Sequence, residues 1–346
     1  MVIRSIELTN FRNFESRKLV FCNRNIFFTG TNGSGKSNLL ESIGFTSLLR
    51  SFRGAPAREM IRLGAREFRL ETVLEGRIAP RKLRISESVC GRRELAINGE
   101  AVRKSSDFIR EFHTVVFAPE DREITAGSSG FRRRFFDILI SELDPEYLLR
   151  LSRYFRALSQ RNRALKTAPR TAGAFEEELA EQAPFIAAKR RYYAGIISGK
   201  VAGLLGGRGA FEINYRTDSA DTAMEHLKLF QSRRQSELRR QCTMCGVQLD
   251  EFDFIFNGKL LRTFGSTGQI RLISLLLKLA QYQVVSSNSS APVAVLADDV
   301  TGELDDDNLN LFLQTISTAD QSFFTFAETP RFTLPDSGMI PVASCC

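Results

Sequence analysis

The chain has 346 residues, of which 43% are hydrophobic, so it is long enough to bury a large core and to form about two domains. Its formal charge of +8 and pI of about 9.3 favour an acidic partner such as a nucleic acid. No apolar run reaches membrane-spanning length and no charged-then-apolar leader follows Met1, so we expect a cytoplasmic protein without membrane contact. The scattered cysteines exclude the paired spacing of a secreted disulfide framework.

The N-terminal part of the chain reads mostly as β-structure. Short apolar runs predict strands at residues 2–8, 18–21, 25–29, 68–74 and 82–85. The Asn98-Gly99 and Asn257-Gly258 pairs predict β-hairpins, because Asn-Gly favours the type I′ turn that matches the twist of the strands.

A complete phosphate-binding loop follows the expected strand at residues 25–29 and precedes a helix with apolar residues at helical spacing. The loop consists of Gly30, Thr31, Asn32, Gly33, Ser34, Gly35, Lys36 and Ser37. Its glycines let backbone N–H groups wrap a phosphate at the helix N-terminus. Lys36 adds a positive charge near the phosphates, and the hydroxyl of Ser37 suits Mg²⁺. The sequence therefore predicts a site for a nucleoside triphosphate.

From about residue 129 to residue 240, charged sequence with helical periodicity replaces the strands and indicates a helical insertion. Breaks at residues 167–174 and 203–209 predict loops between its helices. An α/β pattern then returns, with a helix at residues 269–285, strands at 293–297 and 322–326, and a helix after Asp306. The insertion therefore divides one nucleotide-binding fold.

Two carboxylates, Asp298 and Asp299, end the expected strand at residues 293–297. In a parallel sheet they would lie at the edge that also carries the phosphate loop. Asp298 would hold Mg²⁺, and Asp299 would position or deprotonate the attacking water. The alternative is that the pair only caps a helix.

Two further segments each have a functional and a structural interpretation. Residues 264–269 contain small residues before a helix, so they suit either an anion or a helix cap. Residues 303–305, Glu-Leu-Asp, follow the carboxylate strand and also suit a cap for the next helix.

Taken together, these parts resemble the RecF family of recombination mediators, whose heads are related to the ABC and SMC ATPases. The resemblance covers most of the chain. Besides the phosphate loop, it rests on Leu8-Thr-Asn-Phe-Arg12-Asn-Phe, Phe117-Ala-Pro-Glu-Asp121, Gly130-Phe-Arg-Arg-Arg-Phe-Phe-Asp137, Leu143-Asp-Pro-Glu-Tyr147, Gln160-Arg-Asn162, Ser266-Thr-Gly-Gln269, Asp298-Asp299 and Glu303-Leu-Asp305.

The resemblance implies an α/β fold, a P-loop NTPase of the ABC/SMC-head type with mixed β-sheet lobes split by a helical arm. Its parts would be the N-terminal part of the head at residues 1–126, the arm at 127–250 and the C-terminal part of the head at 251–346. ATP with Mg²⁺ would lie between two subunits, with Ser266, Gly268 and Gln269 as the signature motif. Asp298 and Asp299 would be the Walker B carboxylates acting with Lys36, Asp305 would belong to the D-loop, and Arg12 would lie near the nucleotide.

By the same resemblance, the protein would bind single-stranded, gapped and junction DNA as an ATP-dependent homodimer. It would act with RecR and RecO, help RecA to load, and support the SOS response. Whether it is an enzyme stays open; the family implies slow, DNA-stimulated ATP hydrolysis that serves as a conformational switch. The rival readings are another SMC-like chromosome or defence ATPase and the nucleotide-binding subunit of an ABC transporter.

Three departures from the family pattern bear on these expectations. A stretch usually written Gly-Pro-His-Arg-Asp-Asp is Gly246-Val-Gln-Leu-Asp250-Glu251 here. Asp299 replaces the glutamate of many relatives, and its shorter reach predicts weaker activation of water. Neither histidine lies near residues 325–328, so the switch histidine of ABC transporters is absent, which argues against a transporter and for slow turnover.

The expected arm is rich in arginine with interleaved aromatic residues, which suits contact with phosphates and stacking on bases. The alternative is a solvated charged face over an aromatic core. The residues predicted to bind DNA are Arg132, Arg133, Arg134, Arg153, Arg156, Arg161 and Arg163.

Overall fold

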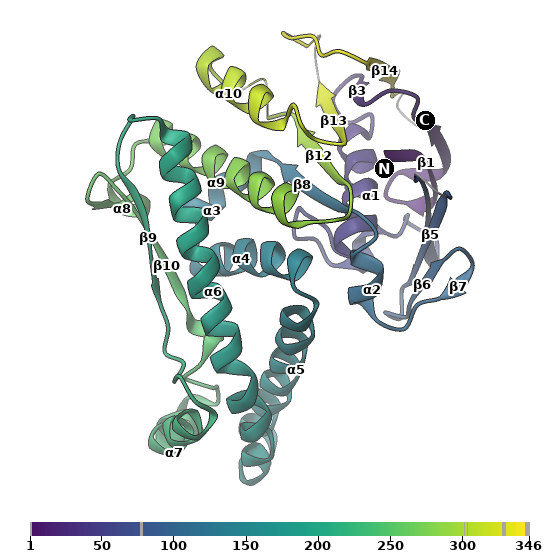
Figure 1. Cartoon of the computed structure of the whole chain (residues 1–346). Coiled ribbons are helices and arrows are strands. Elements are labelled where there is room, and N and C mark those ends of the chain that lie inside the picture. The colour runs from purple at the N-terminus through teal and green to yellow at the C-terminus, as the bar shows by residue number, and fades with distance from the viewer. Residues whose placement is uncertain (1, 77–78, 301, 303, 327–329, 343–346) are drawn as a thin grey trace. The chain divides into compact units, whose positions relative to one another are not determined.

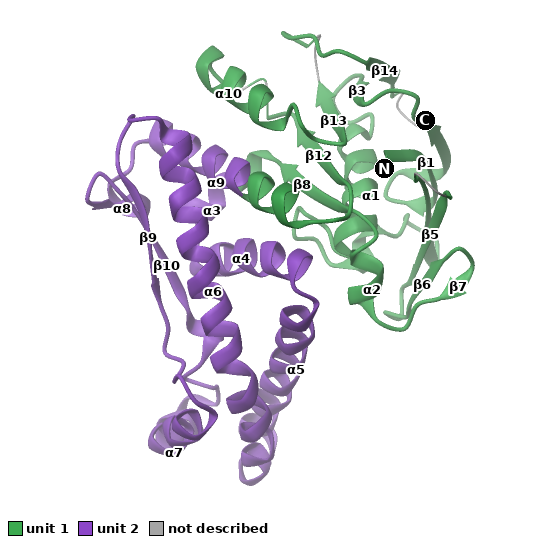
Figure 2. Cartoon of the chain, viewed as in Figure 1, with its two compact units in different colours: residues 1–121, 281–346 green, residues 122–280 purple. Residues whose placement is uncertain are grey.

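A computed structural model of the chain describes residues 2–76, 79–300, 302, 304–326 and 330–342. The chain folds into two compact units, shown in Figure 2. Unit 1 combines residues 1–121 with residues 281–346, and unit 2 comprises residues 122–280. The first unit is therefore assembled from both ends of the chain.

An antiparallel sheet of six strands forms one layer of unit 1, in the order β2-β1-β4-β5-β6-β7. Its strands alternate buried apolar residues with exposed polar ones, as a sheet with one solvated face requires. The strands are β1 (Val2–Phe11), β2 (Phe14–Val20), β4 (Glu67–Glu75), β5 (Arg81–Ser88), β6 (Arg93–Ile97) and β7 (Glu100–Ala101).

A second sheet of unit 1 is parallel and has the order β14-β3-β13-β12-β8. Its inner strands are buried along their length, so they read as continuous apolar runs instead of alternating ones. The strands are β3 (Asn25–Thr29), β8 (His113–Phe117), β12 (Val293–Asp298), β13 (Gln321–Phe326) and β14 (Ser337–Pro341).

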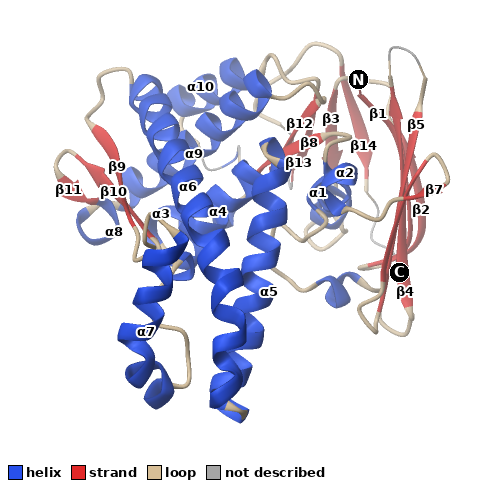
Figure 3. Ribbon diagram, turned by 60° about the horizontal axis from the view of Figure 1, so that its bottom comes forward, coloured by secondary structure: helices blue, strands red, loops and turns tan. Residues whose placement is uncertain are grey.

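Helix α1 (Lys36–Leu48) packs against both sheets and is buried almost throughout (Figure 3). Helix α10 (Asp306–Ile316) covers the parallel sheet, where the ring of Phe312 lies 4.9 Å from that of Phe117. This unit also contains a short helix α2 (Ser105–Ile109), a 3-10 helix at Ala57–Met60 and a 3-10 turn at Pro119–Asp121.

Unit 2 is mainly helical, with a small antiparallel sheet in the order β11-β10-β9. Figure 1 shows its long helices α5 and α6, which pack side by side. Among the described residues, no helix is long and apolar enough to cross a membrane. The elements are α3 (Arg122–Ala126), α4 (Ser129–Leu143), α5 (Pro145–Thr167), α6 (Glu176–Leu205), β9 (Phe211–Arg216), α7 (Ala223–Arg240), β10 (Glu251–Phe256), β11 (Lys259–Leu260), α8 (Leu261–Phe264) and α9 (Thr267–Asn288), with 3-10 helices at Pro169–Phe175 and Val247–Leu249. Helix α9 begins in unit 2, and its residues from 281 onward belong to unit 1.

Both predicted hairpins are present. Asn98 and Gly99 have φ angles of 53° and 88°, and Asn257 and Gly258 have φ angles of 50° and 74°, as a type I′ turn requires at its two central positions. The loop predicted at residues 167–174 is instead largely a 3-10 helix, which Pro169 begins because its φ angle is fixed near the helical value.

Candidate nucleotide-binding site

The phosphate loop connects the carboxyl end of β3 to the amino end of α1. Gly33 and Gly35 have φ angles of 83° and 100°, which favour glycine. A Cβ atom on Gly35 would lie only 2.7 Å from the side chain of Asn13, so this position also has no room for a side chain. The loop therefore presents backbone N–H groups at the N-terminus of a buried helix, where an anion is stabilised.

The ammonium group of Lys36 lies under this loop. Its Nζ atom donates hydrogen bonds to the carbonyl oxygens of Gly30 and Thr31, at 2.8 and 2.9 Å. The hydroxyl oxygen of Ser34 is buried with no hydrogen-bond partner among the described residues. Such an orphaned polar atom is unfavourable unless a ligand satisfies it, so the loop fits a bound phosphate.

Asp298 and Asp299 lie where the sequence predicts them, at the carboxyl end of β12. Asp298 is only 4% exposed, and its Oδ1 atom accepts a hydrogen bond of 2.8 Å from the Thr325 hydroxyl. The backbone N–H of Asp299 donates to the same hydroxyl at 3.0 Å, and Asp299 has a φ angle of 55°. One buried threonine of β13 therefore fixes the carboxylate of Asp298 and the backbone of Asp299 at the end of β12.

The oxygen ligands of this edge fit Mg²⁺. β3, β13 and β12 are adjacent and parallel, so the phosphate loop and Asp298 leave the sheet at the same edge. The carboxylate of Asp298 and the hydroxyl of Ser37 are the hard donors that this ion prefers. Asp298 and Ser37 would hold the ion, which would neutralise charge on the phosphates.

Sequence reasoning missed Arg53, which follows α1. Its Nη2 atom lies 3.0 Å from Oδ2 of Asp298, and its Nη1 atom donates to the side chain of Asn38 at 3.4 Å. No pattern around Arg53 marks it, because its partner Asp298 lies 245 residues away in the chain. Only the parallel sheet brings the two charges together.

Replacing Arg53 with methionine should lower the free energy of unfolding by about 1–2 kcal/mol, because the buried carboxylate of Asp298 loses its cation while Arg53 itself is partly solvated. Adding Asp298→Asn to that variant should recover part of the loss, since the unpaired charge disappears. Urea unfolding of the single and double variants measures both effects. Independent, additive losses would contradict the pairing.

Arg12 is fixed to the helix that follows the phosphate loop. Its Nε and Nη2 atoms donate to the two carboxylate oxygens of Glu41 on α1, at 2.8 and 3.1 Å, and Glu41 is fully buried. Ser51 donates a further hydrogen bond to Glu41. This bidentate pair holds the guanidinium of Arg12 against α1.

The expected signature segment begins α9 in unit 2. The backbone N–H of Ser266 donates to the side chain of Gln269 at 2.9 Å, and the N–H of Gln269 donates to the Ser266 hydroxyl at 3.3 Å. This reciprocal arrangement is a capping box. Ser266 and Gly268 are exposed, so the segment is both a helix cap and an accessible helix N-terminus.

Asp305 caps α10, because its Oδ1 atom accepts a hydrogen bond of 2.8 Å from the N–H of Asn308. The helix cap that the sequence suggests as the structural interpretation of residues 303–305 is therefore present at Asp305. Glu303 and residues 327–328 lie outside the described residues.

The arm arginines divide into three groups by their exposure to solvent. Arg132 and Arg161 are 2% and 1% exposed and are ion-paired, Arg132 with Glu251 and Arg161 with Glu176 and Glu237. These two side chains stabilise the interior of the arm and do not present themselves to a DNA phosphate. Arg133 and Arg134 are half-buried, and burial lowers the pKa of Arg133, whose guanidinium donates to the carbonyl of Asp250.

Three of the predicted arginines remain on the surface, all on α5. Arg153, Arg156 and Arg163 follow the spacing of one helical face, which Leu149 and Gln160 continue. Arg153 pairs with Glu178 at 2.7 Å. Arg156 and Arg163 form no ion pair within the described parts of the chain. This exposed strip, which we call the α5 face, comprises Leu149, Arg153, Arg156, Gln160 and Arg163.

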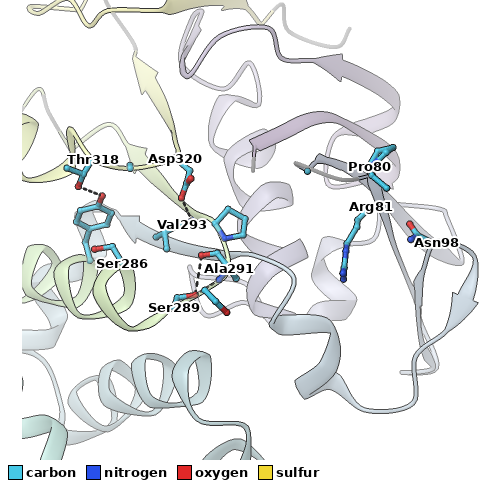
Figure 4. A pocket seen from close by; sticks show the side chains of 15 residues that line it. Pro80, Arg81, Asn98, Ser286, Ser289, Ala291, Val293, Thr318 and Asp320 are labelled. Atoms are coloured by element: carbon cyan, nitrogen blue, oxygen red, sulfur yellow. Dashed lines mark hydrogen bonds between the residues drawn. The ribbon is translucent and has the colours of Figure 1, made fainter.

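A cavity of about 800 Å³ lies at the opposite edge of the parallel sheet, at the amino ends of β12 and β13 (Figure 4). Tyr282 and Thr318 share a hydrogen bond in its wall, and the carboxylate of Asp320 accepts from the N–H of Val293. Arg81 lines it from β5 and is paired with Glu111. The cavity is therefore separate from the phosphate loop, which lies at the carboxyl ends of the strands.

Comparison with known proteins agrees with this geometry. The family model described as the RecF/RecN/SMC N terminal domain matches residues 2–333. The chain is 33% identical to the DNA replication and repair protein RecF of Leptospira biflexa serovar Patoc over 334 residues, which cover 94% of this chain and 91% of that protein. It is 32% identical to RecF of Agathobacter rectalis over 92% of this chain and 90% of that protein.

Solved structures extend the likeness to the fold. A structure of the recombination mediator RecF with ATP, from the RecFOR pathway, has a TM-score of 0.90 and 26% identity, and covers 99% of this chain and 95% of that chain. The Smc head domain of Pyrococcus furiosus has a TM-score of 0.51 and 16% identity, over 94% of this chain and 89% of that chain, and shows the fold alone. The predicted ABC/SMC-head fold is thus confirmed. The chain belongs to the RecF family, within the RecF/RecN/SMC group of P-loop ATPases.

Proposed function

We propose that this chain is an ATP-dependent DNA-binding protein of recombinational DNA repair and replication. The observation that carries this proposal is the joint position of the phosphate loop and Asp298 at one edge of the parallel sheet, in a chain of the RecF family. Solved RecF structures described as containing ATP or ATPrS support the choice of nucleotide.

In this proposal each residue of the site has a defined task. The loop N–H groups and Lys36 bind the phosphates of ATP, while Ser37 and Asp298 hold Mg²⁺. Asp299 positions the attacking water or accepts its proton. Because an aspartate reaches less far than a glutamate, we expect slow turnover, which suits a nucleotide-controlled switch.

The exposed helix N-terminus at Ser266 is the candidate contact with a second subunit. The N–H groups of its first turn and the helix dipole favour an anion, and Ser266, Gly268 and Gln269 are accessible. We propose that they bind the terminal phosphate of an ATP held on the phosphate loop of a second copy of the chain. The ATP-bound state is then a homodimer, with Asp305 in the D-loop.

The α5 face is the candidate contact with DNA. Its arginines would bind phosphates without base specificity, and the partly exposed ring of Phe155 on the same helix offers a surface for stacking on a single-stranded base. Single-stranded, gapped and junction DNA all present such phosphates. On the basis of family membership, we further propose that the protein acts with RecR and RecO, helps RecA to load, supports SOS induction and is located in the cytoplasm.

Replacing Arg156 and Arg163 with glutamine should weaken DNA binding and reduce its dependence on salt. If each arginine binds one phosphate, the slope of log K against log salt should fall in magnitude by about 1.4–1.8. Anisotropy of a labelled gapped duplex, titrated at several salt concentrations with ATP and Mg²⁺, measures the slope.

The matched control is the double variant Arg66→Gln and Arg84→Gln. It removes the same charge from exposed positions of unit 1. Equal losses in both double variants would mean that net charge, and not the α5 face, determines affinity, and would contradict this assignment. The same titration tests the proposed function, because ATP should tighten binding of the wild-type protein.

A further inference from the structure

Two sets of charged contacts in unit 2 share helix α4 and the adjacent residues Asp250 and Glu251, and together they join the arm helices to the segment that carries Ser266. The central residue is Glu251, the first residue of β10. Its Oε1 atom accepts from Nε of Arg132 on α4 at 2.8 Å, and its Oε2 atom accepts from Nη1 of Arg262 on α8 at 3.1 Å. One carboxylate therefore ties two helices to the start of a strand.

Buried contacts hold the arm side of this connection. Asp137 on α4 accepts from both Arg190 on α6 and the hydroxyl of Tyr147 on α5. Arg190 has no exposed surface and also donates to Asp250 at 2.7 Å. Because an unpaired charge at these depths is costly, α4, α5 and α6 are held to the residue that precedes Glu251.

The other side of the connection leaves little freedom before the signature segment. Arg262 lies on the single turn of α8, and only Gly265 separates that turn from Ser266. The N–H of Gly265 donates to the carbonyl of Leu261 at 2.8 Å, and a Cβ atom on Gly265 would lie 2.6 Å from that oxygen. A shift of α8 is therefore passed to Ser266 and its capping box.

We infer that Glu251 and Arg262 are positioning residues, which set the place of Ser266 according to the arrangement of the arm helices. DNA bound on α5 would act through Tyr147 of that helix on Asp137 of α4. The effect would pass from Arg132 of α4 to Glu251, and from Glu251 to Arg262 and α8. This inference rests on the proposed function, because it assigns to the arm the control of the signature segment.

The test uses Arg262→Gln, which removes the guanidinium of a side chain that is 35% exposed and ends its ion pairs with Glu251 and, at 3.5 Å, with Asp253. Its matched control is Arg216→Gln. Arg216 pairs with Asp253 of β10 at 2.7 Å and is 58% exposed. This ion pair joins β9 to β10, and its loss leaves both ion pairs of Arg262, with Glu251 and with Asp253, in place. Steady-state ATP hydrolysis is measured with and without gapped duplex, and kcat and KM are determined separately.

We expect Arg262→Gln to reduce the DNA stimulation of kcat about tenfold, while KM for ATP and the affinity for DNA stay within about twofold of wild type. Arg216→Gln should keep the stimulation, and Arg262→Lys should restore most of it because the positive charge remains. Full stimulation in Arg262→Gln, or an equal loss in both glutamine variants, would overturn the inference. A wild-type protein with neither DNA stimulation nor an ATP-dependent dimer would instead overturn the proposed function.

Discussion

Lys36→Ala should lower the affinity for ATP about 10- to 100-fold. The variant loses charge-assisted hydrogen bonds to the phosphates, and one such bond contributes about 1.5–3 kcal/mol. It also loses the two bonds from Nζ to the loop carbonyls of Gly30 and Thr31, so the loop itself should become less ordered. Isothermal titration with ATP and Mg²⁺ measures the change in affinity.

Lys18→Ala is the control for this measurement, because Lys18 is an exposed lysine of the same unit, on β2. It changes the net charge equally and should leave ATP binding at the wild-type level. If Lys36→Ala binds ATP as tightly as Lys18→Ala does, the assignment of the phosphate loop as the ATP site is wrong.

The second large effect is expected for Ser266→Arg, which should leave ATP binding intact and weaken the ATP-dependent dimer at least about tenfold. The variant removes the hydroxyl that accepts from the N–H of Gln269, and it places a bulky cation at the positive end of the α9 dipole. Light scattering with a slowly hydrolysed ATP analogue measures the dimer, and a nucleotide titration of the same sample measures ATP binding.

Ser266→Thr keeps a hydroxyl at the cap and should dimerise almost as well as wild type. Loss of the cap alone costs about 1 kcal/mol of stability, so a thermal melt separates this effect from the loss of the dimer. A dimer of normal stability in Ser266→Arg would exclude the signature segment from the contact between subunits.

The nucleotide-binding unit could be predicted well because its signals are local. The loop from Gly30 to Ser37, the apolar strand before Asp298 and the two Asn-Gly turns each depend on residues close together in sequence. The structure places strands, turns and carboxylates at these positions. Parallel strands with both faces buried appear as short apolar runs, and such runs can be recognised in a single sequence.

The pairing of charges could not be predicted. Arg132 and Arg161 stand among other charged residues in the sequence, which suggests that they are exposed. Only the packing of α4 and α5 shows that they are paired with Glu251 and Glu237. Arg53 is missed for the same reason, since the sheet places Asp298 beside it. Ion pairs between distant segments leave no periodic signal, so a basic composition overstates the charge available to DNA.

The sequence of residues 246–251, which differs from the family pattern, can also be explained in physical terms. Without the family's histidine and arginine, this segment still provides buried contacts through its last two residues. Asp250 accepts from Arg190, Tyr215 and Thr217, although burial raises the pKa of its carboxyl group. Glu251 accepts from Arg132 and Arg262. The carboxylates therefore maintain the connection between the arm and β10.

Sedimentation velocity of the wild-type protein with a labelled gapped duplex tests the central claim most directly, because it reports the nucleotide effect, the dimer and DNA binding in one experiment. With ATP and Mg²⁺, the label should sediment with two copies of the chain, and without nucleotide it should sediment largely as free duplex. A sedimentation coefficient of the label that is the same with and without ATP would contradict the account.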